Sequence, residues 1–182
     1  MKQRSRTIAS YTFPQDWSLE ERTTWQNVRK GVQQAKEEGR RIVFVTGVFD
    51  LYHREHQIFL EKARAAGNYL VVGVETDHRV REIKGPDRPI DPEAKRLQNV
   101  IESDVVDEAA LLPAAFYRQE HYQAVMNVLR PHVLAVSSHS PYQENKRLLA
   151  ELYGGQLVIV HEHNPSVSTT QLLEQRTMDS HG

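Results

Sequence analysis

The chain has 182 residues, of which 39% are hydrophobic and 26% charged, so it is long enough to bury a substantial core and its composition excludes extended disorder. A formal net charge of −1 provides no overall positive field, so we expect no nucleic-acid partner, and the lack of cysteine excludes disulfides and thiolate nucleophiles. No apolar run approaches the roughly 20 residues of a membrane span, so we expect no membrane partner. We also expect a cytoplasmic protein, because the basic N-terminus is not followed by an apolar signal-peptide core.

Helix and strand signals alternate from residue 18 onwards. Residues 1–17 have no clear period and are expected to be an N-terminal tail whose aromatic side chains pack onto the domain or lie in an interface. Ser18 and Glu21 match a capping box, which predicts a leader helix over 18–39. The apolar β-branched run over 41–46 predicts a first strand that is buried on both faces.

The same alternation continues to the end of the chain. It predicts a helix from near His53 to Gly67, a strand over 69–75, a short helix over 77–83, a helix capped by Asp91, a strand over 104–108, a helix over 118–130, a strand over 132–136, a helix that starts at Ser140 and ends at Gly154, a strand over 157–160 and a terminal helix capped by Ser168. Such a pattern is typical of the α/β class, here a Rossmann-like parallel sheet of about five strands with helices on both faces. We expect a single domain over 18–176 and a C-terminal tail over 177–182.

The stretch 43–56, VFVTGVFDLYHREH, holds the most informative residues. It reads as a strand, a short turn and a helix N-terminus, at the edge of a parallel sheet where ligands bind. His53 and His56 lie about 60° apart on a helix, so both can face one ligand. Imidazole donors and free backbone N–H groups at a helix N-terminus suit phosphate. Taken alone, the pair could also be solvated surface histidines or a metal pair, but the pattern is not H-E-x-x-H, which excludes a zincin.

Further motifs extend this stretch into an ordered set. They are LEER (19–22), TGVFDLYHREH (46–56), KGPDRP (84–89), GGQLVIV (154–160) and VSTTQLL (167–173). Together they resemble the cytidylyltransferase-like nucleotidyltransferases, which are marked by TGxFDxxHxGH. The nearest pattern is that of the adenylyltransferase domain of the bifunctional heptose-phosphate kinase/adenylyltransferases. The resemblance covers about residues 19–174.

The resemblance implies a reaction in which a phosphate oxygen of a phosphorylated small molecule attacks the α-phosphorus of ATP or CTP and pyrophosphate leaves. A sugar 1-phosphate is the favoured acceptor. Catalysis of this kind is mainly positioning and charge stabilisation. Mg²⁺ is expected on the nucleotide phosphates rather than in a metal site built from side chains. Dimers are common in the family, so a homodimer is a further expectation.

The resemblance also assigns individual residues. The catalytic set is His53, His56 and Lys84. The nucleotide-binding set is Thr46, Gly47, Val48, Phe49, Asp50, Ser168, Thr169 and Thr170. The acceptor- or phosphate-binding set is Arg88, Arg96, Asp77 and Arg79. Each set has a plainer alternative: the 84–89 loop could be solvated, the 168–170 segment only a helix cap, Arg96 a surface ion pair, and His139, His161 and His163 are better explained as loop histidines than as a metal cluster.

The chain departs from the family pattern at Glu55, where the family has glycine. A glutamate charge 4 Å from a phosphate charge would cost about 1 kcal/mol in water and about 4 kcal/mol at an intermediate dielectric. On a helix, however, Glu55 lies about 160° from His53 and about 100° from His56, so it could point away from the phosphates. The rival function is therefore a non-catalytic nucleotide- or phosphometabolite-binding protein of the same fold. A second departure, SSHSPY over 137–142 in place of a KGGDY-like segment, leaves the acceptor and the base open.

Overall fold

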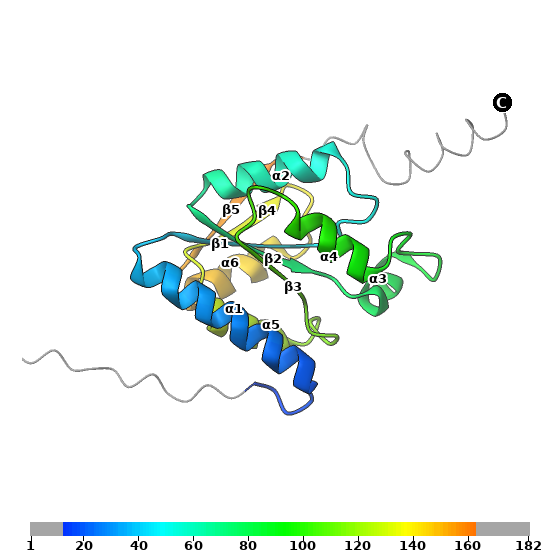
Figure 1. Ribbon diagram of the computed structural model, residues 1–182, viewed down its shortest axis with the longest axis horizontal. Helices are drawn as coiled ribbons and strands as arrows, with labels where there is room; N and C mark the ends of the chain where they lie inside the picture. The colour runs from blue at the N-terminus through cyan, green and yellow to red at the C-terminus, as the bar shows by residue number, and fades with distance from the viewer. Residues whose placement is uncertain (1–12, 163–182) are drawn as a thin grey trace, which may run out of the picture.

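The computed structural model describes residues 13–162, in which helices and strands alternate (Figure 1). The helices are α1 (Leu19–Glu37), α2 (Arg54–Ala65), α3 (Asp77–Lys84), α4 (Glu93–Ile101), α5 (Gln119–Leu129) and α6 (Gln143–Leu152). The strands are β1 (Ile42–Gly47), β2 (Tyr69–Val74), β3 (Glu108–Leu111), β4 (Val133–Ser137) and β5 (Gln156–His161). No helix in this part of the chain is long and apolar enough to cross a membrane.

The strands form one five-stranded sheet in the order β3-β2-β1-β4-β5. Every pairing is parallel, and β1 lies at the centre, with Val43 opposite Leu70 on one side and Val133 on the other. The chain builds outwards from β1 first towards β3 and then towards β5, so the order reverses beside β1. Ligands of open parallel sheets bind outside the carboxyl ends of the strands at such a reversal. The predicted fold class is confirmed, and the predicted site follows the central strand.

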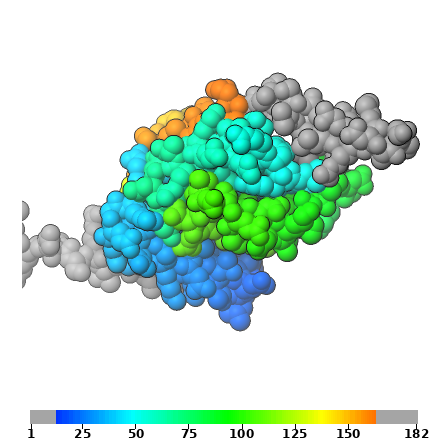
Figure 2. Space-filling model, turned by 45° about the horizontal axis from the view of Figure 1, so that its top comes forward, coloured from blue at the N-terminus to red at the C-terminus, as the bar shows by residue number. Residues whose placement is uncertain are grey.

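Helices cover both faces of the sheet because both faces of β1 are apolar. Ile42 and Phe44 pack in the core shared with α1 and α5, whereas Val43 and Val45 pack in the core shared with α2 and α4. Figure 1 shows α1 and α5 on the opposite side of the sheet from α2. On the surface, α2 (cyan) adjoins the part of the chain from α3 to α4 (green), as Figure 2 shows.

Three predicted boundaries differ from the structure. The strand predicted over 104–108 begins only at Glu108, because Asp107 turns its carboxylate to the backbone N–H of Leu70. Asp91 does not cap α4: its carboxylate accepts from Lys95, and Pro92 is the N-cap residue. The helix predicted from Ser140 begins instead at Gln143.

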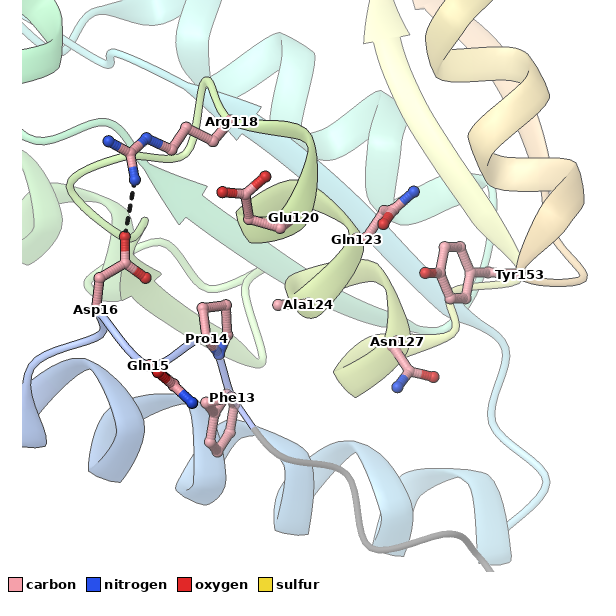
Figure 3. Close-up of a pocket in the computed structure, with 10 residues that line it drawn as sticks. All are labelled: Phe13, Pro14, Gln15, Asp16, Arg118, Glu120, Gln123, Ala124, Asn127 and Tyr153. Atoms are coloured by element: carbon pink, nitrogen blue, oxygen red, sulfur yellow. Dashed lines mark hydrogen bonds and ion pairs between the residues drawn. The ribbon is translucent and has the colours of Figure 1, made fainter.

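Residues 13–17 of the expected N-terminal tail pack onto α5. Trp17 is buried and its Nε1 donates to His121 Nδ1 at 3.0 Å, while His121 Nε2 donates to the carboxylate of Asp16 at 3.0 Å. A pocket of about 650 Å³ lies between this segment and α5, and Figure 3 shows Arg118 paired to Asp16 at its rim. The pocket lies on the face of the sheet opposite α2, so it is separate from the predicted site.

Candidate active site

The loop after β1 places an aromatic ring beneath the histidines. Phe49 is 3% exposed, and its ring centroid lies 5.5 Å from that of His56. Phe49 and Leu51 adopt φ values of 53° and 47°, a left-handed conformation that costs free energy in residues with a side chain. A Cβ atom at Gly47 would lie 2.8 Å from the Phe49 ring, so only glycine fits this close approach. The TGVFD motif therefore encodes a strained turn.

The two histidines form a stacked pair in the first turn of α2. His53 is the N-cap residue, and its Nδ1 accepts from the backbone N–H of Glu55 at 3.2 Å. His56 Nδ1 accepts in turn from the backbone N–H of His53 at 3.3 Å, and the ring centroids lie 4.1 Å apart. Because both Nδ1 atoms accept, each neutral ring carries its proton on Nε2. The pair therefore offers two Nε2–H donors at a helix N-terminus.

Both histidine rings are neutral near pH 7. Burial lowers the pKa of His53, although the Glu55 carboxylate opposes the shift. Burial lowers the pKa of His56 to about 3, helped by the charges of His53 and Lys84 and opposed by Asp50. A phosphate bound beside these rings would favour their charged form and raise both values.

Asp50 connects the loop after β1 to the KGPDRP loop. It is 2% exposed and accepts from the backbone N–H groups of Ile90 and Asp91, at 3.1 and 2.9 Å, and from the Arg88 guanidinium. Burial alone would raise the pKa of Asp50, but these amide hydrogen bonds and the positive charges of Arg88 and Arg96 outweigh burial and lower it. Asp50 is thus a buried carboxylate anion that orients Arg88.

Arg96 is buried and connects three segments of the chain through hydrogen bonds. Its guanidinium donates to Val48 O at 2.6 Å, to Asp91 O at 3.0 Å and to Asp77 Oδ1 at 2.7 Å. The side chain is 0% exposed, so the alternative of a surface ion pair is wrong. All three nitrogens donate to the protein, which suits a role in positioning the loop after β1. The predicted contact of Arg96 and Asp77 with an acceptor therefore gains no support from their geometry.

Lys84 and Arg79 border the same edge of the sheet from α3. Lys84 ends the helix, and its charge acts on His56, so the two belong to one site. Partial burial and the charge of Arg88 lower the pKa of Lys84, with Asp50 opposing. Arg79 pairs with Glu82 at 3.0 Å and lies over the Tyr117 ring, 5.1 Å from its centroid.

Glu55 turns towards β5. Its Oε2 lies 3.3 Å from His161 Nε2, and Lys62 Nζ lies 3.3 Å from the other ring nitrogen. His161 is the last residue of β5 and is 9% exposed, so its assignment as a loop histidine is wrong. The carboxylate that replaces the motif glycine therefore has a partner at the end of β5.

Some predicted residues lie outside the described part of the chain, namely Ser168, Thr169, Thr170 and His163. Two further residues at the carboxyl edge, Glu75 after β2 and Lys146 in α6, were missed. Glu75 was detectable, because it is a carboxylate at the end of an otherwise apolar strand. Lys146 carries no local signal and is placed only by the fold.

The comparisons with known proteins agree with this geometry. The model of the Cytidylyltransferase-like family matches residues 44–175. The chain is 33% identical over 145 residues to the bifunctional protein HldE of Pelobacter propionicus, a match that covers 79% of this chain and 28% of that protein. It is 29% identical over 157 residues to HldE of Hahella chejuensis, covering 86% and 32%. The chain thus spans less than a third of the length of these curated relatives.

Two solved structures share the fold. The lipopolysaccharide core biosynthesis protein of Thermoplasma volcanium superposes with a TM-score of 0.59 at 25% identity, covering 69% of this chain and all of that one. Pantothenate synthetase of Thermus thermophilus superposes with a TM-score of 0.53 at 15% identity, covering 85% and 68%, which shows the fold alone. The carboxyl end of the central strand, the strained loop and the histidine pair fall inside the region that the family model matches, and the chain belongs to the Cytidylyltransferase-like family.

Proposed function

We propose that the protein transfers a nucleotidyl group from ATP or CTP to a phosphorylated small molecule and releases pyrophosphate. The observation that carries this proposal is the stacked His53–His56 pair, with both Nδ1 atoms held by backbone N–H groups. Two Nε2–H donors fixed at a helix N-terminus stabilise negative charge without having to reorganise during the reaction.

The proposed reaction needs no covalent intermediate with the protein. An oxygen of the acceptor phosphate forms a bond to the α-phosphorus, the bond from that phosphorus to the bridging oxygen breaks, and pyrophosphate leaves with its electron pair. His53 and His56 donate to phosphate oxygens, and Lys84 supplies positive charge beside them. Asp50 holds Arg88 in orientation, and a guanidinium suits bidentate capture of phosphate.

Mg²⁺ fits this proposal as a companion of the nucleotide. Among residues 13–162 no group of three or more His, Asp or Glu side chains could hold a metal ion, and Asp50 already accepts from Arg88, Ile90 and Asp91. The ion would be held mainly by the phosphates and would neutralise part of their charge. The residues of the chain then bind and orient the magnesium-bearing triphosphate.

A sugar 1-phosphate is the favoured acceptor. The support is the combination of the KGPDRP and STT motifs, together with the similarity to a protein whose name refers to lipopolysaccharide core biosynthesis. ATP is preferred slightly over CTP as donor by the same resemblance.

The rival proposal is a non-catalytic nucleotide- or phosphometabolite-binding protein, impaired by Glu55. The Glu55–His161 contact favours the catalytic proposal over this rival, because it directs the carboxylate to β5. Pyrophosphate release with Mg²⁺, each nucleoside triphosphate and a panel of sugar, polyol and amino-alcohol phosphates tests both. The transferase is supported if the wild type releases pyrophosphate and His56→Ala abolishes this release. The variant must also keep the circular-dichroism spectrum of the folded protein. Nucleotide binding without release from any combination supports the rival.

A further inference from the structure

Glu75 is a partly buried carboxylate at the predicted site that the roles above leave unused. It directly follows β2, and its backbone N–H donates to Gly47 O at 2.9 Å, so it lies beside the first residues of the TGVFD loop. Its Oε2 is enclosed by protein and has no hydrogen-bond partner within the part of the chain that the structure describes. A buried carboxylate oxygen without a donor is costly, so its retention points to a ligand that supplies the donor.

Positive charges surround Glu75 without neutralising it directly. Arg79, Lys146 and Arg96 all act on it electrostatically, yet none of the three makes a hydrogen bond or ion pair with it in residues 13–162. Arg79 is paired with Glu82, and Arg96 with Asp77. Burial raises the pKa of Glu75, and the three cations oppose that rise.

Lys146 in α6 is one of the cations whose charge acts on Glu75. Its Nζ donates to Ser140 Oγ at 2.7 Å, and Gln143 in the same helix donates to Ser138 O at 2.8 Å. These bonds join α6 to the 137–142 loop, where the chain departs from the family pattern. Burial lowers the pKa of Lys146, and Glu75 opposes the shift. The bond to Ser140 uses one of the three N–H groups of the Lys146 ammonium. The described residues leave the other two without an acceptor.

We propose that Glu75 and Lys146 form the subsite for the non-phosphate end of the acceptor, and that they select an uncharged, hydroxyl-rich molecule. This inference rests on the proposed nucleotidyl transfer and names the class of its acceptor. The phosphate of the acceptor would lie towards Lys84 and Arg88, and its hydroxyl groups towards Glu75 and Lys146.

The chemistry of the pair explains the selection. A hydroxyl group both donates and accepts, so one hydroxyl can donate to Glu75 and accept from Lys146. An ammonium group could donate to Glu75 but cannot accept from Lys146. A carboxylate could accept from Lys146 but cannot donate to Glu75, so neither group satisfies both members of the pair. Buried groups that lose a hydrogen-bonding partner discriminate strongly against analogues that lack it.

The test uses Glu75→Gln and Lys146→Met, with Glu20→Gln and Lys30→Met on exposed positions of α1 as matched controls. We expect each subsite variant to raise KM for sugar and polyol phosphates at least tenfold while the Kd for ATP or CTP changes less than twofold. Lys146→Met should also reduce the ratio between kcat/KM for hydroxyl-rich phosphates and kcat/KM for amino-alcohol phosphates. Both controls should keep wild-type values.

Thermal unfolding separates ligand binding from a structural role. Removing a buried charge that has no partner should leave the Tm of Glu75→Gln unchanged or raise it, whereas a carboxylate that stabilises the fold would give a lower Tm. The subsite is overturned if KM for the acceptor is unchanged, whether or not the Tm falls. It is also overturned if the affinity for nucleotide falls as much as the affinity for the acceptor.

If the wild type binds nucleotide but releases no pyrophosphate with any acceptor, the proposed transfer fails and the subsite is judged by calorimetry. Titration with sugar 1-phosphates then decides: binding that Glu75→Gln weakens tenfold supports the subsite. Equal binding to both proteins, or binding to neither, overturns it.

Discussion

The contact between Glu55 and His161 predicts that the effect of a substitution at one position depends on the other. In the wild type His161 holds the carboxylate 3.3 Å from its Nε2, so Glu55→Ala should change nucleotide affinity less than threefold. His161→Ala removes this partner and frees the carboxylate within the first turn of α2. Adding Glu55→Ala to His161→Ala should restore the affinity.

The size of the effect follows from the charge and its exposure. A freed carboxylate that comes within about 4 Å of a phosphate costs about 1 kcal/mol in water and about 4 kcal/mol at an intermediate dielectric. The Glu55 side chain is 23% exposed, which favours the lower part of this range. We therefore expect His161→Ala to weaken ATP or CTP binding about tenfold, equivalent to about 1.4 kcal/mol.

Calorimetric titration of the two single variants and the double variant measures the coupling. Glu55→Gly is a poorer choice than Glu55→Ala, because glycine destabilises a helix by about 1 kcal/mol. A change in nucleotide affinity could then arise from the loss of helix stability. The reasoning is refuted if His161→Ala binds nucleotide as the wild type does, or if Glu55→Ala in the wild-type background tightens binding tenfold.

Three other predictions concern the stability of the folded chain. Arg96→Met should lower the free energy of unfolding by about 3 kcal/mol in urea, because Asp77 and two carbonyl groups lose a buried donor; Lys30→Met is the control. His121→Phe should cost about 1–3 kcal/mol, because Trp17 Nε1 loses its acceptor and Asp16 a donor, and a variant as stable as the wild type contradicts this. The folded-state pKa of His56, about 3, lies below its ordinary value of 6.5, so His56 stabilises the fold above pH 6.5 and this contribution is lost as the pH falls towards 3, by up to about 1.4 kcal/mol per pH unit. Urea unfolding at pH 7 and pH 5 should therefore show a smaller loss for His56→Gln than for the wild type, and equal losses contradict the assignment.

The fold was largely predictable because its signals are local. The apolar run before Gly47, the glycine that ends the second helix and the Ser18–Glu21 capping box each lie within a few residues of the element they define. One of the exceptions has a long-range cause. The carboxylate of Asp107 binds the N–H of Leu70, 37 residues earlier, and so delays the start of β3. Asp91 satisfies every local rule for an N-cap, but its carboxylate accepts from Lys95 and Pro92 takes the N-cap position.

The candidate site was predictable in part for the same reason. His53 and His56 are three residues apart, so their approach follows from the helix. Arg96 was expected near the site, but its burial follows from partners 5, 19 and 48 positions away, which no spacing rule reveals. Lys146 comes near Glu75 only because β1 pairs with both β2 and β4.

Position 55 shows how the functional question changes once the fold is known. By pattern alone, a glutamate in a phosphate-binding motif is a defect, and its charge argues for a protein that has lost catalysis. In the fold its carboxylate lies 3.3 Å from Nε2 of His161, 106 positions later, and Lys62 Nζ lies 3.3 Å from the other ring nitrogen. The carboxylate also lies in the first turn of α2, where negative charge favours the helix. The substitution is thus compatible with the proposed phosphate site as long as His161 supplies this partner, so residues 55 and 161 have to be compared together before a chain with this motif is judged inactive.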